Sequence, residues 1–358
     1  MQPMTRFATA CFAALLLSVA AHAQTPRMGP DQSPATNSVD AGFASKQQQQ
    51  QLTQPLNNQP LWSEVRSGSP QFTSLPGRET NILIQPEGQT WRALRNSQVS
   101  VYAGWGLVLM VVLIAGFYFW KGTMQLHEPP TGRKIRRFTN WQMAIHWTTA
   151  YAFVTLAITG LIIVFGKNVL LPLIGYTLFS WLAILAKNLH NFIGPLFFIC
   201  ILLLFFTFVR DNFWRRYDFN WLRHFGGLIS KQDVPSGKFN AGEKLWFWGG
   251  VLVAGLIVSA SGFILDFPNF NQTRNTMQIA NIVHLCIASL FMLAALGHIY
   301  MGTIGMAGAY QAMSKGYVDE TWAKEHHLYW YNDIKGGKIP TAPDDAPVPL
   351  VPPRAATR

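Results

Sequence analysis

The stretch IANIVHLCIASLFMLAALGHIYM, residues 279–301, decides the fold. It contains no Asp, Glu, Lys or Arg and is long enough to cross a bilayer as a single helix. His284 and His298 both lie in this stretch, fourteen residues apart. That separation is close to four helical turns, so both imidazoles project from one face of the helix, about 21 Å apart along its axis. Because a histidine in hydrocarbon is costly, it normally marks a functional site.

The composition indicates a membrane protein. The chain has 358 residues, of which 49% are hydrophobic and 13% are charged, whereas about 25% of the residues of a typical soluble domain are charged. A net charge of +11 is compatible with nucleic-acid binding, but the basic residues cluster beside apolar stretches. We therefore interpret them as positive-inside topology signals and expect no nucleic-acid partner.

Five apolar stretches are long enough to cross a membrane, at about residues 99–120, 141–165, 189–209, 245–267 and 279–301. The predicted fold class is an all-α membrane protein, a bundle of five transmembrane helices. Residues 169–186 are also nearly all apolar, but Pro172 and Gly175 interrupt them. A sixth span there would place the basic loop 210–244 outside the cell, against the positive-inside rule. We therefore expect an interfacial loop or helix at 167–187, on the outer face.

The N-terminus has the pattern of a secretory signal peptide, residues 1–23. A basic residue precedes an apolar core at 12–19 and a small-residue cleavage site, Ala-His-Ala. The polar residues 24–97 are then expected to form a partly disordered periplasmic extension. The remaining predicted parts are an extra transmembrane helix, a four-helix core and a cytoplasmic tail, at residues 98–121, 134–303 and 304–358.

The charge pattern assigns a depth in the membrane to each of four histidines. Basic residues concentrate in the loops after the first and third spans, which the positive-inside rule places in the cytoplasm. His146 and His298 then lie near the cytoplasmic ends of their helices, and His190 and His284 near the outer ends. Because partners must share a depth, we expect the couples His146 with His298 and His190 with His284. Two bis-histidine haems stacked across the membrane are the simplest assembly that uses all four.

Two imidazoles on one haem iron fill its coordination sphere, which suits electron transfer rather than oxygen chemistry. Each ligand is expected to be a neutral imidazole, oriented by a hydrogen bond from its other ring nitrogen. The sequence has no Cys-x-x-Cys-His motif, so a thioether-linked haem is excluded. The alternative for the histidines is hydrogen bonding between helices or proton relay. Four glycines fit either room for a porphyrin or ordinary close packing of membrane helices: Gly160, Gly194, Gly262 and Gly297.

The segment from Lys238 to Lys244, KFNAGEK, opens the fourth predicted span. Asn240 fits a helix N-cap and Glu243 stands at the third helical position, as in a capping box. The same polar groups also suit the carbonyl of a quinone head group. From the residues alone, the cap is the favoured interpretation.

The other histidines carry weaker signals. His127 and His224 fall in predicted loops and are expected to be solvated. His326 and His327 lie in the tail beside Trp322. We expect an amphipathic segment there, packed on the membrane or on a partner protein.

Taken together, these residues resemble the dihaem cytochrome b (gamma) subunit of membrane-bound respiratory formate dehydrogenase. The resemblance covers about residues 134–331. The histidine spacing is shared with the b cytochromes of quinone-linked hydrogenases, whereas the Asn-Ala-Gly segment and the tail are more specific to the formate type. The N-terminal extension is similar to longer variants and adds the first span, which contributes no ligand. The motifs that carry the resemblance are Arg137-Phe138 upstream of His146-Trp147, Leu189-His190 followed by Gly194, Lys238 to Lys244, the pair His284 and His298, and Trp322 to His327.

The resemblance implies a four-helix dihaem cytochrome b core in a bacterial inner membrane. The chain would be a subunit of a formate:quinone oxidoreductase, without a formate-oxidising site of its own. A catalytic (alpha) subunit and an iron–sulfur (beta) subunit are the implied partners, and quinone bound near Asn240 and Gly242 is the implied acceptor. Glu243 stands where other members can have Gln. The implied cofactors are two haem b groups, with their iron held by His146, His190, His284 and His298.

Two alternative functions remain open from the sequence. One is the b cytochrome of a quinone-linked hydrogenase or other reductase. The other is a haem-free membrane anchor or transporter, in which the histidines relay protons. Haem analysis and the identity of the co-purifying enzyme separate the three.

Overall fold

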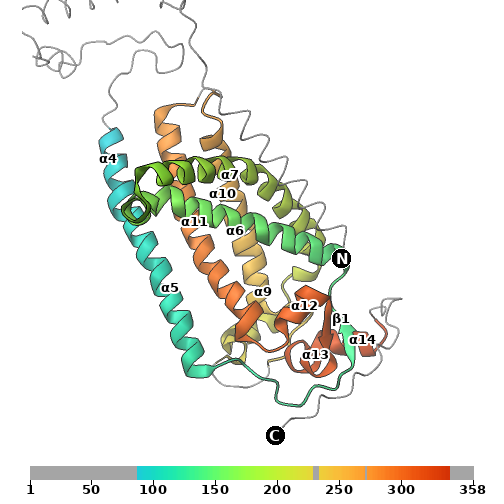
Figure 1. Cartoon of the computed structure of the whole chain (residues 1–358). Helices are drawn as coiled ribbons and strands as arrows, with labels where there is room; N and C mark the ends of the chain where they lie inside the picture. The colour runs from blue at the N-terminus through green and yellow to red at the C-terminus, as the bar shows by residue number, and fades with distance from the viewer. Residues whose placement is uncertain (1–86, 229–233, 271, 339–358) are drawn as a thin grey trace, which may run out of the picture. The chain divides into compact units, whose positions relative to one another are not determined.

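The computed structural model describes residues 87–228, 234–270 and 272–338 (Figure 1). The chain divides into a unit formed by Met1–Gly88 with Asn271–Thr273 and a larger one, Gln89–Phe270 with Arg274–Arg358. The larger unit holds the candidate site and is described below. The predicted signal peptide and most of the polar extension lie outside the described residues.

Five helices within the described ranges are long and apolar enough to cross a membrane, which confirms the predicted number of spans. The chain is therefore a multi-pass membrane protein. The helices run over Gly88–Lys121, Asn140–Val169, Leu171–Asn212, Ala241–Asp266 and Arg274–Gly305.

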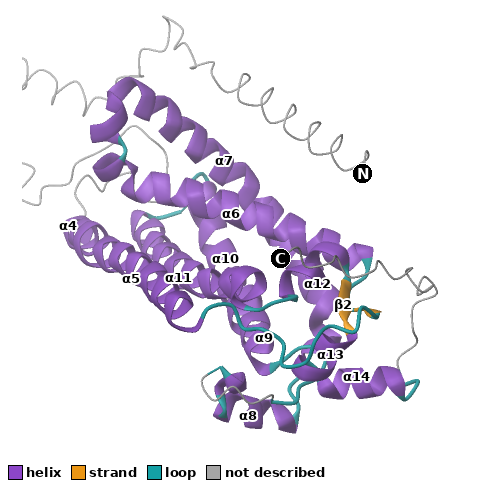
Figure 2. Ribbon diagram, turned by 60° about the horizontal axis from the view of Figure 1, so that its bottom comes forward, coloured by secondary structure: helices purple, strands orange, loops and turns teal. Residues whose placement is uncertain are grey.

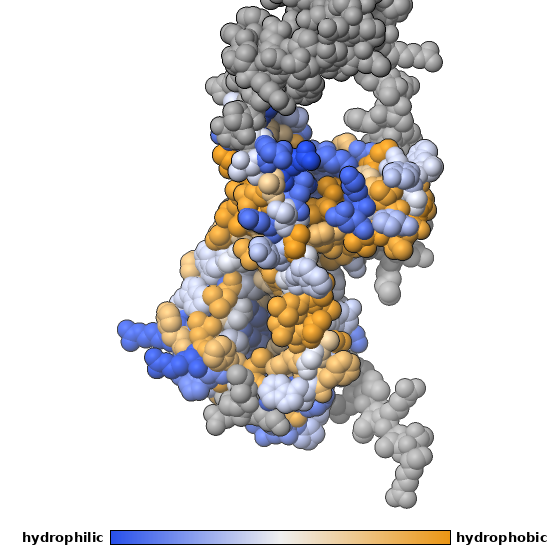
Figure 3. Space-filling view, turned by 90° about the vertical axis from the view of Figure 1, so that its left-hand side faces the viewer, coloured by the Kyte–Doolittle hydropathy of each residue, from blue (hydrophilic) through white to orange (hydrophobic). Residues whose placement is uncertain are grey.

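The first span starts earlier than its apolar residues predict. Helix α4, Glu87–Ala93, continues through a π-helical segment, η1, Leu94–Val99, into α5, Ser100–Lys121. Figure 3 shows hydrophobic side chains spread over one face of the molecule, with hydrophilic patches toward the upper and lower ends. An exposed apolar surface of this extent is typical of contact with lipid. The exposed hydrophobic side chains of α5 include Tyr102, Trp105, Leu109, Val112, Phe119 and Trp120.

Helices α6, Asn140–Val169, and α7, Leu171–Phe208, lie side by side in both ribbon views (Figures 1 and 2). Helix α6 begins with a capping box, in which the Thr139 hydroxyl accepts a hydrogen bond from the Gln142 backbone and the Gln142 side chain accepts one from the Thr139 backbone. Gly166 faces the Phe179 ring and Gly160 faces the His190 ring, so the two helices pack as antiparallel neighbours over much of their length.

Helix α7 includes the stretch that we expected to be an interfacial loop or helix. The stretch is helical, but it is broken at Gly175, whose φ of 74° and ψ of 172° only glycine adopts readily, so that two helical segments meet at a kink there. Pro172 lies in the first turn, where its missing N–H costs no hydrogen bond. With 38 residues, the helix is longer than the roughly 30 Å hydrocarbon core is thick.

The fourth and fifth spans each combine α-helix with a π-helical segment. Helix α9, Ala241–Leu245, leads through η4, Trp246–Ala254, into α10, Gly255–Asp266. Helix α11, Arg274–Tyr300, ends in η5, Met301–Gly305. Helix α11 packs against both α10 and α5. Because π-helical segments occur frequently at functional sites, η1, η4 and η5 mark candidate functional regions.

One end of the larger unit gathers the loops after the first and third spans together with the tail (Figure 2). A short antiparallel pair of strands joins β1, before α6, to β2, in the tail. The elements at this end are β1 Lys134–Arg136, η2 Val209–Asn212, α8 Arg216–Arg223, η3 Phe225–Gly227, α12 Ala309–Lys315, β2 Tyr317–Asp319, α13 Glu320–His326 and α14 Leu328–Lys335.

The tail packs on the chain itself, so the expectation that it lies on the membrane or on a partner was wrong for its described part. Trp322 is 2% exposed and His327 is 1% exposed, inside the core that β2 and α13 form with the rest of the chain. The pairing of β1 with β2 holds the tail in this position. The expectation failed because that pairing involves residues far apart in the sequence, which a local hydrophobic pattern does not reveal.

Candidate functional site

The four membrane histidines come together in two couples. His146 of α6 faces His298 of α11, with 6.2 Å between ring centroids. We call this couple the second pair, and the couple nearer the other end of α11 the first pair. His190 of α7 faces His284 of α11, with 6.0 Å between centroids, and these are the first pair. Helix α11 therefore contributes one imidazole to each pair.

The centroid spacing of both pairs has room for one metal ion between the rings. A bond between imidazole nitrogen and a metal ion is about 2 Å long. Two such bonds, plus the distance from each nitrogen to its ring centre, place the centroids roughly 6 Å apart. Imidazoles joined by a direct hydrogen bond would lie about 1 Å closer, because their nitrogens would be about 3 Å apart. The observed distances therefore fit a shared metal better than direct hydrogen bonds between helices.

In the first pair, hydrogen bonds show that Nδ1 carries a proton in both rings. The carbonyl of Val258, on α10, lies 2.9 Å from His284 Nδ1, and since a carbonyl only accepts, Nδ1 carries the proton. Thr159, on α6, lies 2.8 Å from His190 Nδ1 and donates its own hydroxyl proton to the Thr155 carbonyl, so here too Nδ1 donates. In the neutral imidazole, a proton on Nδ1 leaves Nε2 as the nitrogen that can bind a metal.

The second pair has a different environment. Trp246, in η4, stacks on the ring of His298 at 4.9 Å and an interplanar angle of 14°. Trp147 contacts the ring of His146 edge-on. His146 Nδ1 is buried without a hydrogen-bond partner in the described part of the chain. A buried imidazole with one unsatisfied nitrogen is typical of a site completed by a further group.

Two glycines allow the first pair to approach the neighbouring helices. A Cβ atom at Gly160 would lie 3.4 Å from His190 Cε1, and one at Gly262 would lie 3.2 Å from His284 Cε1. Gly194 faces open space. By contrast, a Cβ at Gly297 would meet Met110 of α5, so this glycine serves packing between helices.

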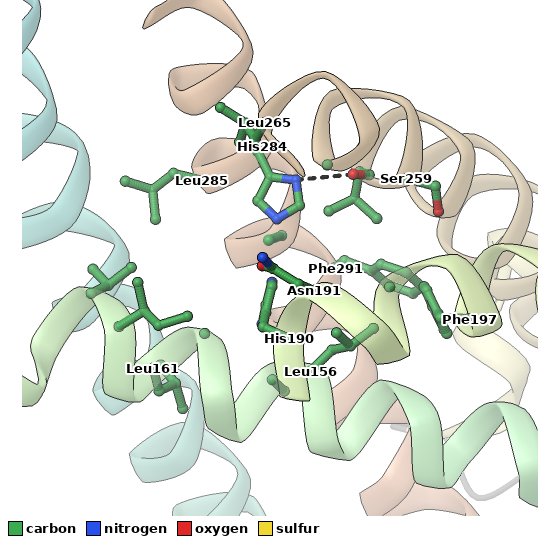
Figure 4. Close-up of a pocket in the computed structure, with 18 of the residues that line it drawn as sticks. Leu156, Leu161, His190, Asn191, Phe197, Ser259, Leu265, His284, Leu285 and Phe291 are labelled. Atoms are coloured by element: carbon green, nitrogen blue, oxygen red, sulfur yellow. Dashed lines mark hydrogen bonds between the residues drawn. The ribbon is translucent and has the colours of Figure 1, made fainter. Parts of the chain in front are cut away.

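A cavity of about 220 Å³ surrounds the first pair. Figure 4 shows His190 and His284 directed toward each other from α7 and α11, with Phe197 and Phe291 beside them. The lining is mostly apolar, with Gly160, Gly194 and Gly262 among it. An apolar cavity with two facing imidazoles and glycine walls suits a flat, largely apolar cofactor such as haem.

The sequence did not identify three charged residues that also line this cavity. They are Arg95 of η1, Lys187 of α7 and Asp266 of α10. For Arg95, the sequence showed only that a basic residue lies just before the first predicted span. Its approach to the cavity depends on how the first span packs against α11, which no local pattern specifies.

The predicted capping box at the start of α9 is confirmed. Asn240 Oδ1 accepts a hydrogen bond of 2.9 Å from the Glu243 backbone, and Glu243 Oε2 accepts one of 2.8 Å from the Asn240 backbone. The nearly buried Arg137 binds Glu243 at 3.1 Å and the Lys238 carbonyl at 2.7 Å. A Cβ at Gly242 would lie 3.0 Å from the Trp221 ring, so this segment is tightly held. Glu243 also lies within electrostatic reach of His298.

Buried charges stabilise the same end of the molecule. Lys244 and Asp218 form an ion pair of 2.7 Å, with side chains 2% and 0% exposed. His327 Nδ1 donates to the Gly237 carbonyl at 2.6 Å. Burial, together with the positive charge of Arg137, holds the pKa of His327 well below its usual value, so the ring is neutral. His127 and His224 are both exposed, although His127 lies 3.7 Å from Glu325.

A membrane helix bundle with facing histidine couples buried between its helices has the architecture of a b-type cytochrome. Comparison with known proteins gives the family. Residues 137–316 match the sequence model of the prokaryotic cytochrome b561 family, and the chain belongs to that family. A membrane electron-transfer role and haem b follow from this membership. The match excludes the first span, which precedes residue 137.

Within this family, the chain is similar to cytochrome b556 subunits of formate dehydrogenases. The chain is 29% identical over 205 residues to the formate dehydrogenase cytochrome b556(fdo) subunit of Escherichia coli K12, covering 56% of this chain and 93% of that protein. It is 26% identical to the nitrate-inducible cytochrome b556(Fdn) subunit of the same strain, over 54% of this chain and 88% of that protein. A cytochrome b556 subunit of formate dehydrogenase from Haemophilus influenzae is 25% identical, over 52% and 78%. The resemblance found in the sequence is thus confirmed.

Proposed function

We propose that this chain is the haem-carrying membrane subunit of a formate dehydrogenase and conducts electrons from an iron–sulfur subunit to quinone. The observation that carries the proposal is the arrangement of four histidines in two facing couples, with 6.0 and 6.2 Å between ring centroids. Helix α11 joins the couples, about 21 Å apart along its axis. Similarity to formate dehydrogenase cytochrome b556 subunits suggests the electron donor.

In this proposal the first pair and the second pair would each hold one haem b between their facing imidazoles. When bound, haem b supplies reversible one-electron chemistry at its iron. Because both imidazoles of a pair would bind the iron, the site would suit electron transfer rather than oxygen binding. In the first pair, the hydrogen bonds of Nδ1 to Thr159 and Val258 orient the rings and place the proton on Nδ1.

Aromatic side chains fill the space between the two pairs. Phe291 lies midway between His284 and His298 on α11 and is 4% exposed. Its ring lies 4.8 Å from that of Phe153 and 5.5 Å from that of Trp246, which in turn stacks on His298. These rings exclude water and keep the separation of the pairs constant, as close packing requires.

For the quinone we propose the start of α9, near Asn240 and Gly242. The capping box occupies Asn240 Oδ1 and leaves its amide NH₂ to donate to a quinone carbonyl. The nearness of Glu243 to His298 links this segment to the second pair. Because Glu243 is engaged by the Asn240 backbone and by Arg137, we give it the role of holding the segment in place.

The proposed topology places the second pair toward the cytoplasm and the first pair toward the periplasm, in the inner membrane. It rests on the basic loops that the structure gathers at one end. The signal peptide 1–23 would be removed, leaving residues 24–97 in the periplasm. The catalytic and iron–sulfur partners would then bind on the side of the first pair.

The proposal is tested by purifying the chain with its bound partners and adding formate. We expect a molybdenum or tungsten enzyme to co-purify and formate to reduce both haems, measured by the optical alpha band. His284→Ala is expected to block reduction, whereas His298→Ala is expected to leave the first-pair haem reducible but stop electron transfer to a soluble quinone analogue. Co-purification of a nickel–iron enzyme, or a chain without haem, would contradict the proposal.

A further inference from the structure

Helix segment η1 brings a cation to the cavity of the first pair from a span that lies outside the family match. Arg95 is half-buried, and its Nε donates a 2.9 Å hydrogen bond to Asn281 Oδ1 on α11. Asn281 precedes His284 by three residues, so the two share a face of α11, one turn apart. The guanidinium is therefore fixed one helical turn from a histidine of the first pair.

The charge of Arg95 is not neutralised within the described ranges. Its Nη1 donates to Asn96 Oδ1 at 2.7 Å, and Arg95 forms no ion pair with a carboxylate that the structure describes. With Nε and one Nη1 hydrogen in use, three of its five N–H donors remain. Asp266, the carboxylate among the lining residues, lies instead within electrostatic reach of Lys187.

We propose that Arg95 binds a propionate of the haem held by His190 and His284, so that the first span forms part of this haem site without supplying an axial ligand. Haem carries two carboxylates on one edge of an otherwise apolar ring, and an arginine fork is the side chain best suited to bind a carboxylate by two hydrogen bonds. This inference rests on the proposed function, because it requires haem at the first pair.

The position of Lys187 supports the proposal that the carboxylate edge of the haem faces Arg95. Lys187 precedes His190 by three residues on α7, as Asn281 precedes His284 on α11. Lys187 and Asn281, the partner of Arg95, therefore each lie one turn before a histidine of the first pair, and both cations line the cavity. A ring clamped between the two imidazoles with its carboxylate edge toward these cations meets Arg95, while its apolar edges meet the aromatic lining.

The experiment compares three variants of the full chain in nanodiscs of neutral lipid. Arg95→Gln removes the charge, Arg95→Lys keeps a charge without the fork, and Arg92→Gln is the matched control, an exposed arginine of α4 that does not line the cavity. The readouts are the midpoint potential of the first-pair haem, resolved in a His298→Ala background, and the rate of haem transfer to an apoprotein acceptor.

We expect Arg95→Gln to lower the midpoint potential, since loss of a nearby positive charge favours the ferric state, and to speed haem loss about tenfold. Arg95→Lys should fall between Arg95→Gln and wild type, and Arg92→Gln should match wild type. If Arg95→Gln matches Arg92→Gln while the first-pair haem is present, the role of Arg95 is refuted while the proposed function stands. If the effect of Arg95→Gln arises only when anionic lipid is added, Arg95 binds a lipid phosphate instead. A wild-type chain without haem refutes the proposed function itself.

Discussion

Replacing Thr159 with valine tests whether the first pair is oriented as a haem ligand set. Valine has nearly the shape of threonine but lacks the hydroxyl that accepts the hydrogen bond from His190 Nδ1 at 2.8 Å. Thr159 is 4% exposed, so water does not readily replace the lost acceptor. The substitution therefore removes one hydrogen bond from the ring of His190 with little change in packing.

The size of the effect follows from the burial of the donor. A buried N–H left without an acceptor costs about 1 to 3 kcal/mol. The Leu156 carbonyl also lies within hydrogen-bonding reach of His190 and offers a second acceptor. We therefore expect the lower part of that range, about 1.4 kcal/mol, or tenfold weaker haem binding at the first pair.

The assay is haem retention by the purified chain during incubation with an apoprotein acceptor, followed optically. Thr155→Val is the matched control, because its hydroxyl bonds only the Tyr151 carbonyl one turn back on α6, and Thr159→Ser should restore retention. The second-pair haem should be unaffected in all three. If Thr159→Val retains both haems as firmly as Thr155→Val, then His190 is not held for ligation in the way the structure indicates.

Three further predictions concern packing and charge. Gly262→Val should displace His284 and cost the first-pair haem, measured by haem content, whereas Gly116→Val, where a Cβ meets no atom within 4 Å, should keep both. Lys244→Met should destabilise the fold by about 3 to 5 kcal/mol by leaving Asp218 buried and unpaired, whereas Lys324→Met, from the exposed pair with Glu128, should cost less than about 1 kcal/mol in chemical denaturation. Burial lowers the pKa of folded His327, so the unfolded chain binds more protons below a pH of about 6.5, and stability should fall as pH drops from 7 toward 5 by up to about 1.4 kcal/mol per unit. His327→Gln should reduce that slope in denaturation measured across the same pH range, and an unchanged slope would show that other groups set it.

The apolar pattern predicted the spans well because length and hydrophobicity alone decide whether a helix crosses a membrane. The capping box of Asn240 and Glu243 was also predictable, since it depends on two residues three positions apart. The pairing of the histidines needed only their depth, which the charged loops indicate. Their role as haem ligands stays a prediction.

Features that depend on backbone conformation or on distant contacts were harder to predict. Pro172 and Gly175 both suggested an interruption; proline fits the first turn of α7, whereas the interruption is present at Gly175, where two helical segments meet at a kink. The start of the first span at Gly88 carries no apolar signal. The approach of Arg95 to the cavity and the burial of Trp322 both arise from packing between segments far apart in the sequence.

The central claim is that two imidazole couples each hold one haem b. It is tested most directly by measuring haem b per chain, by the pyridine haemochrome method, in the wild-type protein and in the variants His284→Ala and His298→Ala. The account predicts two haems per chain in the wild type and one in each variant. Two haems remaining in both variants, or none in the wild type, would contradict it.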